Sequence, residues 1–194
     1  MYRFFIIIFS IFFFNSCKKE EVIHKEFWEN GELKTVYKFQ DLKDSTYQKE
    51  VYFPSGALKE KLRFVDGLRD DSSFSYYESG EKFGLLIYKD GLLNGCAYSW
   101  YEDGSLKSIF HFNNHRIVDR ANYFPNGQIM NDLEYGSDGF LNHGIYYFEN
   151  GNIRSCGWWN HNEKIGIWQN YDENGFLIKE VDYSLITGFT NFPE

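Results

Sequence analysis

Apolar and polar residues alternate along most of this chain, in segments that recur with a period of about 24 residues. Each segment begins at a glycine that follows Asn, Ser or Asp, and an aromatic residue stands four positions before it. A unit repeated at a fixed period indicates an array in which each unit contacts mainly its neighbours. The seven glycines are Gly31, Gly56, Gly80, Gly104, Gly127, Gly151 and Gly175.

The residues after each glycine have the period of a β-strand. Apolar side chains stand at offsets +2, +6 and +8 from the glycine, as in Leu58, Leu62 and Phe64, and most residues between them are polar. Even offsets place side chains on one face of a strand. We therefore expect half-buried antiparallel strands whose three apolar positions share a face.

Two turns are predicted in each unit. Asn-Gly between alternating apolar residues favours a type I′ turn, which needs positive φ at both central residues. A second turn follows about 12 residues later, and the chain returns through a strand that ends in paired aromatic residues. The second turns are Asp66-Gly67, Asp90-Gly91, Asn114-His115, Asp138-Gly139 and His161-Asn162.

One unit is then one hairpin, and seven units predict roughly fourteen strands in a meander. The predicted fold class is all-β, an antiparallel hairpin repeat array that forms one long twisted sheet. Its core is expected to be a ladder of aliphatic and aromatic side chains on one face.

The repeated pattern resembles the MORN repeat, in the variant form found in many bacterial proteins. The best matching stretches are 76–95, 100–112 and 147–166. The resemblance implies a β-hairpin array used for binding or scaffolding, without assigned catalytic residues, and some bacterial members carry an antitoxin label. The second-turn glycine is replaced at Leu42, His115 and Asn162, which predicts local irregularity, and a later motif glycine is kept at Gly95 and Gly166.

The N-terminus has the pattern of an export signal. Its apolar run, residues 4–14, is shorter than the roughly 20 residues of a membrane-spanning helix, which favours a cleaved signal peptide over residues 1–16. The sequence Asn15-Ser16-Cys17 resembles a lipoprotein lipobox, which implies lipidation of Cys17. The alternative is an ordinary signal peptide with an incidental cysteine.

The remaining segments follow from these boundaries. Residues 17–26 are expected to form the lipidated cysteine and a charged tether, and residues 27–183 the repeats. Residues 184–194 are either a fraying end or a cap over the last strand edge. The run 18–21 also resembles a surface-sorting signal of bacterial lipoproteins, so a surface-exposed and a periplasm-facing anchor at the outer membrane both stay open.

The charge of the chain excludes one class of partner. Without residues 1–16, 19 basic residues stand against 28 acidic ones, a net charge of −9. Such a chain is poorly suited to the phosphates of nucleic acids, so no nucleic-acid partner is expected.

No motif predicts catalysis, a metal or a cofactor. His111 and His115 are four residues apart in a predicted strand and turn, and the Asp-Gly turns lack the calcium-loop pattern. Cys96 and Cys156 lie about five strands apart, roughly 24 Å at ~4.8 Å per strand. A disulfide needs Cα atoms within about 7 Å, so both thiols are predicted to be unpaired.

A second aromatic stripe is the candidate binding site. It occupies position −3, three residues before the glycine, in six of the seven units and is interrupted at Asp172. We expect it on the face opposite the −4 aromatics, and Trp158 and Trp159 are expected to add one ring to each face. It either forms a strip for a protein or glycan partner, or packs because the ribbon coils. The stripe comprises Trp28, Phe53, Tyr77, Tyr101, Phe124 and Phe148.

These patterns together predict a non-enzymatic, lipid-anchored protein of the bacterial cell envelope whose array is a scaffold for a protein partner. One alternative is an antitoxin or immunity-like protein that neutralises a toxin. A further alternative is a surface glycan-binding protein.

Overall fold

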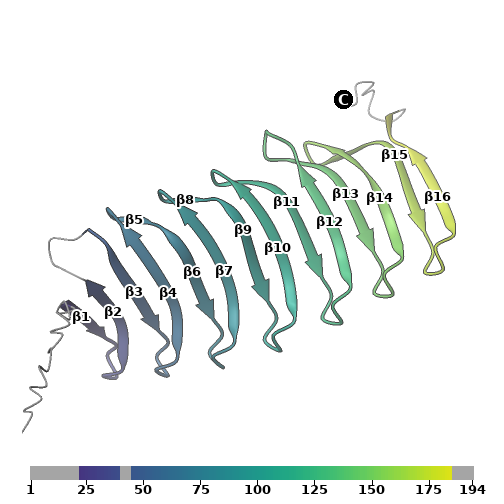
Figure 1. The fold of residues 1–194 in the computed structure, drawn as a ribbon. Coiled ribbons are helices and arrows are strands. Elements are labelled where there is room, and N and C mark those ends of the chain that lie inside the picture. The colour runs from purple at the N-terminus through teal and green to yellow at the C-terminus, as the bar shows by residue number, and fades with distance from the viewer. Residues whose placement is uncertain (1–21, 40–44, 185–194) are drawn as a thin grey trace, which may run out of the picture.

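The computed structural model describes residues 22–39 and 45–184, and all of their regular elements are strands (Figure 1). They are β1 (Val22–Phe27), β2 (Leu33–Phe39), β3 (Tyr47–Tyr52), β4 (Leu58–Val65), β5 (Leu68–Arg69), β6 (Asp71–Tyr76), β7 (Lys82–Lys89), β8 (Leu92–Leu93), β9 (Gly95–Trp100), β10 (Leu106–Asn113), β11 (Arg116–Tyr123), β12 (Ile129–Tyr135), β13 (Leu141–Tyr147), β14 (Ile153–Asn160), β15 (Glu163–Tyr171) and β16 (Leu177–Asp182).

Several predictions fall outside these residues. The signal peptide, Cys17, the turn at Leu42 and the tail after Ser184 are not described. The tether is described in part, and there β1 begins at Val22, so the sheet starts before the boundary expected at residue 27.

The strands form one antiparallel sheet in which fourteen strands follow one another in chain order, and the short β5 and β8 pair with β4 and β7. The predicted all-β hairpin array is confirmed. Figure 1 shows a single curved layer with the first turns along one edge and the second turns along the other.

The first turns differ from the predicted type I′ geometry. At Asn126-Gly127 only the glycine has positive φ, +84°. The amide of Gly127 donates to the Phe124 carbonyl at 2.9 Å, and the Phe124 amide donates to the Gln128 carbonyl at 2.8 Å. This is a three-residue loop, a type I turn followed by a left-handed glycine that forms a bulge. The type I′ prediction is therefore wrong at these turns.

Most of the second turns carry the type I′ geometry instead. Asp138-Gly139 is the exception, because only Gly139 has positive φ there and its amide donates to the Gly136 carbonyl, as in the loops of the first turns. At Asn114 and His115 φ is +48° and +68°, and at His161 and Asn162 it is +45° and +71°. Asn and His tolerate this region better than most side chains. The backbone amide of Leu93 also donates to His115 Nδ1 at 2.6 Å. The turns therefore form without glycine. The pairing beside them is locally irregular, with register shifts between His111 and Phe112 and between Cys156 and Trp158.

The bulge at each first turn changes which side chains share a face. Tyr52 pairs with Leu58, but Val51, its neighbour, pairs with Glu60, so one residue is skipped. Leu62 pairs with Lys49. Because Lys49 stands three residues before Tyr52 on the same strand, Lys49 and Leu62 lie on the face opposite that of Tyr52. The +2 residues thus lie with the −4 aromatics, and the +6 residues lie on the opposite side. The expectation that offsets +2, +6 and +8 share a face is wrong.

Most of the best buried residues lie on the face of the +6 residues, here called the core face. One row of paired residues crosses six strands there: Ala97, Phe110, Arg120, Leu133, Gly144 and Gly157. Ala97 and Leu133 are 2% and 4% exposed. Because the described residues form no second layer over the sheet, side chains of one face cover each other. Arg120 lies 5.6 Å from the ring of Phe110, which stacks on Phe112.

Two sequence predictions about side chains are confirmed within residues 22–39 and 45–184. Cys96 and Cys156 are both unpaired. Trp158 pairs with His143 on one face, and Trp159 packs on Trp168 on the other.

A substitution at Gly157 would test how closely the side chains of this single layer pack. A Cβ at this position would stand 2.4 Å from the ring of Trp168, which is 2% exposed and donates its Nε1–H to the Trp158 carbonyl at 2.9 Å. Gly157→Ala should therefore lower the free energy of unfolding by about 2 kcal/mol, measured by urea denaturation. Gly84→Ala is the control, because its closest contact is the rotatable hydroxyl of Ser75. Equal losses in both variants would contradict this packing.

Candidate binding surface at the first-turn edge

The seven first turns lie in a row, and asparagine side chains connect several of them. Oδ1 of Asn126 accepts the backbone amide of Gln128 at 2.9 Å, which closes its own turn. Nδ2 of Asn126 donates to the Glu149 carbonyl in the next turn at 3.2 Å. Asn30 and Asn150 make the same contact with the turns that follow them. An aspartate or serine lacks the amide donor, so asparagine has a physical role here beyond its turn propensity.

The predicted aromatic stripe lies along this edge, and its six rings are half-buried. The hydroxyls of Tyr77 and Tyr101 donate to the carbonyls of Trp100 and Tyr123, each in the next unit, at 2.9 Å. Lysine side chains at offset +3 stand over three of the rings, with Nζ of Lys34 4.8 Å from the Trp28 ring. The stripe therefore contributes to contacts between units while one part of each ring stays accessible.

Neighbouring turns leave recesses between them. One, of about 480 Å³, lies between Phe124 and Phe148 of the stripe. Tyr147, Asn150 and Arg154 complete its walls, together with Glu149 and Glu173. A recess of about 440 Å³ lies earlier along the edge, between Tyr76 and Trp100. Rings and carboxylates thus meet in hollows that recur along the row of turns.

Exposed carboxylates give this edge its charge. Hydrogen bonds from the Ser105 side chain and backbone hold the pKa of Asp103 below its usual range, so its charge persists in mildly acidic solution. The exposed acids at the first turns are Glu29, Glu32, Glu78, Glu81, Glu102, Asp103, Glu149 and Glu173.

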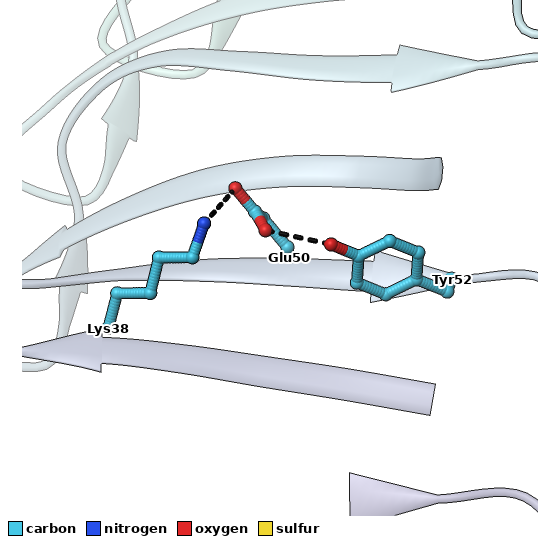
Figure 2. Close-up of polar contacts among 3 residues, drawn as sticks. All are labelled: Lys38, Glu50 and Tyr52. Atoms are coloured by element: carbon cyan, nitrogen blue, oxygen red, sulfur yellow. Dashed lines mark hydrogen bonds and ion pairs between the residues drawn. The ribbon is translucent and has the colours of Figure 1, made fainter. Parts of the chain in front are cut away.

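A buried polar network lies between β2 and β3, on the face opposite the core face (Figure 2). Lys38 Nζ and the Tyr52 hydroxyl each donate to one carboxylate oxygen of Glu50, both at 2.8 Å. Glu50 is only 9% exposed. Both oxygens are satisfied by neighbours in the sheet, so the network has a structural role.

The network shifts the protonation of both acidic groups. Partial burial alone would raise the pKa of Glu50, but the hydrogen bonds from Lys38 and Tyr52 and the charges of Lys38 and Lys61 outweigh it, and the pKa falls below its usual value. Burial, followed by the hydrogen bond to Glu50, raises the pKa of Tyr52 to about 12. Tyr52 therefore remains a hydrogen-bond donor across the physiological pH range.

Sequence reasoning missed this network, although a signal exists. Glu50 stands six residues before its glycine, where other units carry Phe74, Tyr98 or Ile145. A buried charged residue at a position that is apolar in four of the seven units marks a place where a partner is needed.

A cluster at the C-terminal end was missed as well. Nζ of Lys164 stands 4.0 Å from the centroid of the Trp168 ring and within 6 Å of the rings of Trp159 and Tyr183. The two indoles meet edge to face at 5.1 Å. The three rings belong to different strands or turns, so only the register of the sheet brings them together.

The histidines have local partners. His111 contacts Asp119 on the next strand, His143 packs on Trp158, and His161 packs on Phe140. Within residues 22–39 and 45–184, no three His, Cys, Asp or Glu side chains come together as ligands for a metal ion. No helix in those residues has the length and apolar character that crossing a membrane requires.

Comparison with protein families supports the repeat assignment. Residues 93–114, from β8 to the second turn after β10, match the family model described as MORN repeat variant. No curated protein matches the chain.

The solved structures similar to this chain are distant. A mutant of S. aureus TarM is 8% identical over 48% of this chain and 19% of its own, with a TM-score of 0.36. A glycosylation associate protein (Gap123) complex from Streptococcus agalactiae is 17% identical over 62% and 20%, also at 0.36. A porin-like protein from Bacteroides uniformis is 13% identical over 79% and 55%, at 0.27. This chain spans about a fifth of the first two structures, and at these scores none of them indicates a function.

The Glu50 network predicts a pH-dependent stability. Because the folded state lowers the pKa of Glu50, its contribution is complete above the usual value of 4.5 and is lost as the pH falls through the lower folded value. Glu50→Gln should cost about 1–2 kcal/mol at pH 7, and the difference from wild type should close in acid. Urea midpoints across pH 2–7 measure this.

Glu60→Gln on β4 is the matched control, since the Glu60 side chain makes no hydrogen bond within the described part of the chain. A Glu50→Gln difference that stays constant down to the lowest pH would argue against the ionised network.

Proposed function

We propose that this chain is a non-enzymatic, lipid-anchored protein of the bacterial cell envelope, and that its repeat array is a scaffold for a protein partner. The first-turn edge supports this proposal, because it combines accessible aromatic rings with exposed carboxylates in recurring recesses. Aromatic anchors in partly enclosed pockets contribute strongly to protein interfaces. The match of residues 93–114 to the MORN repeat variant is consistent with a repeat scaffold.

The charge of the edge defines the partner's chemistry. Eight exposed acids accompany the stripe, so a complementary surface carries lysine or arginine together with apolar groups. Association should be faster at low salt, because screening weakens attraction between exposed charges.

The proposed anchor places the sheet close to a membrane. Five residue steps separate Cys17 from Val22, which at ~3.5 Å per residue is a reach of about 18 Å. The partner would therefore be another envelope protein or the exposed part of one. The antitoxin-like and glycan-binding alternatives require a toxin or a carbohydrate at the same surface.

The anchor is tested by metabolic labelling with a clickable fatty acid in the full chain. Label should appear on the wild type and be lost in Cys17→Ala, while Cys96→Ala keeps it. Protease treatment of intact cells then distinguishes a surface-exposed anchor from a periplasm-facing one. Equal labelling of the wild type and Cys17→Ala would refute lipidation at this cysteine.

The partner surface is tested with a photo-crosslinking amino acid at Gln128 on the first-turn edge and, as a control, at Ser137 on the second-turn edge; both positions are exposed. A discrete crosslinked protein is expected from Gln128 and not from Ser137. Glu149→Lys with Glu173→Lys should remove at least ~90% of it, because the charge of the recess is reversed from negative to positive.

The matched charge control is Glu134→Lys with Glu163→Lys, which changes the net charge equally near the opposite edge and should leave the crosslink intact. Equal crosslinking from both edges, or loss in the control alone, would refute the assigned surface. Crosslinks to carbohydrate or to a toxin would favour one of the two alternatives instead.

A further inference from the structure

The strands β1 and β16 form the two ends of the sheet. Within residues 22–39 and 45–184, β1 pairs only with β2, and β16 pairs only with β15. Apolar residues that are half-buried inside the array are exposed here, with Phe27 59% and Leu177 51% exposed. Both ends therefore have unpaired backbone groups beside uncovered apolar side chains, the usual conditions for strand addition.

Every junction between consecutive units uses the same register. The residue at offset +4 from one glycine pairs with the residue at −5 from the next, and +5 pairs with −6. All six internal junctions follow this rule: Thr35–Val51 and Val36–Glu50, Glu60–Ser75 and Lys61–Phe74, Gly84–Ser99 and Leu85–Tyr98, Ser108–Asn122 and Ile109–Ala121, Asn131–Tyr146 and Asp132–Ile145, and Ser155–Asn170 and Cys156–Gln169.

The same rule defines what the two ends would present to each other. On β16, Lys179 and Glu180 stand at +4 and +5 from Gly175. On β1, Glu26 and Lys25 stand at −5 and −6 from Gly31. In the common register Lys179 meets Glu26 and Glu180 meets Lys25. Both pairs are of opposite charge, whereas none of the twelve internal pairs is.

We propose that β16 of one copy of this chain pairs with β1 of a second copy, head to tail, so that the sheet continues across the junction. The two ion pairs would lie on opposite faces, since consecutive residues of a strand point to opposite sides. They would select this register over a one-residue slip, which would place Lys179 opposite Lys25. Because the two surfaces differ, the association does not close after two copies and extends into longer assemblies.

Edge charges also have a protective role in many sheets, where they prevent pairing with other chains. That role requires only that charged residues are present at the edge. It does not depend on which residue is positive and which is negative. Head-to-tail pairing depends on the signs, so exchanging them at one end separates the two explanations without changing the composition of the chain.

The experiment measures the mass of the full chain in detergent by sedimentation velocity over a concentration series. The wild-type mass should rise with concentration beyond that of a dimer, and added salt should lower it. Lys25→Glu with Glu26→Lys, and separately Lys179→Glu with Glu180→Lys, should each weaken association about tenfold or more, since two attractive pairs become repulsive. Circular dichroism checks that each variant keeps its strands.

The decisive arm combines the exchanges. A chain with both ends exchanged should recover association, because each charge again meets its opposite. Monomers at all concentrations, equal association in all variants, or no recovery in the combined chain would overturn the proposal. Deletion of residues 185–194 is the last arm, and association that appears only after this deletion would assign the β16 edge to the chain's own C-terminal segment and overturn it as well.

Discussion

The left-handed glycine at each first turn is the constraint on which the rest of this structure depends. It closes a three-residue loop and inserts one extra residue into the following strand, as Tyr52–Leu58 and Val51–Glu60 show. That extra residue determines which side chains reach each face of the sheet. A single sheet has no second layer to correct an error of register, so the same bulge has to recur in every unit.

A single layer must also be stabilised differently from a domain with two packed layers. Few side chains are fully buried, and each unit can be covered only by its neighbours. The contacts between units therefore carry much of the stability: asparagine amides join adjacent turns, tyrosine hydroxyls reach the next backbone, and cations lie over rings. The Glu50 network and the Lys164 cluster are further contacts between neighbouring strands, near the two ends of the sheet.

Spacing alone was enough to predict the repeats, the hairpins, the meander and the unpaired Cys96 and Cys156, because these depend on a period and on strand separation. The turn type was not predictable from Asn-Gly alone, since that dipeptide fits both a two-residue type I′ loop and a three-residue loop with a bulge. The face assignment failed for the same reason, as one bulge reverses the parity of all later offsets. Gly157 is explained only by the position of Trp168, and Glu50 by that of Lys38.

The two proposed contact surfaces on this chain are geometrically separate. The aromatic and acidic edge runs along the row of first turns, whereas the paired charges Lys25, Glu26, Lys179 and Glu180 lie in the terminal strands. Partner binding and growth of the sheet can therefore occur in the same molecule. Each added copy would extend the row of recesses by the same spacing, and a partner with several basic segments would gain avidity without any new type of contact. In an array with a uniform junction register, every added copy adds further binding sites for the partner. A closed oligomer, in contrast, has a fixed number of sites.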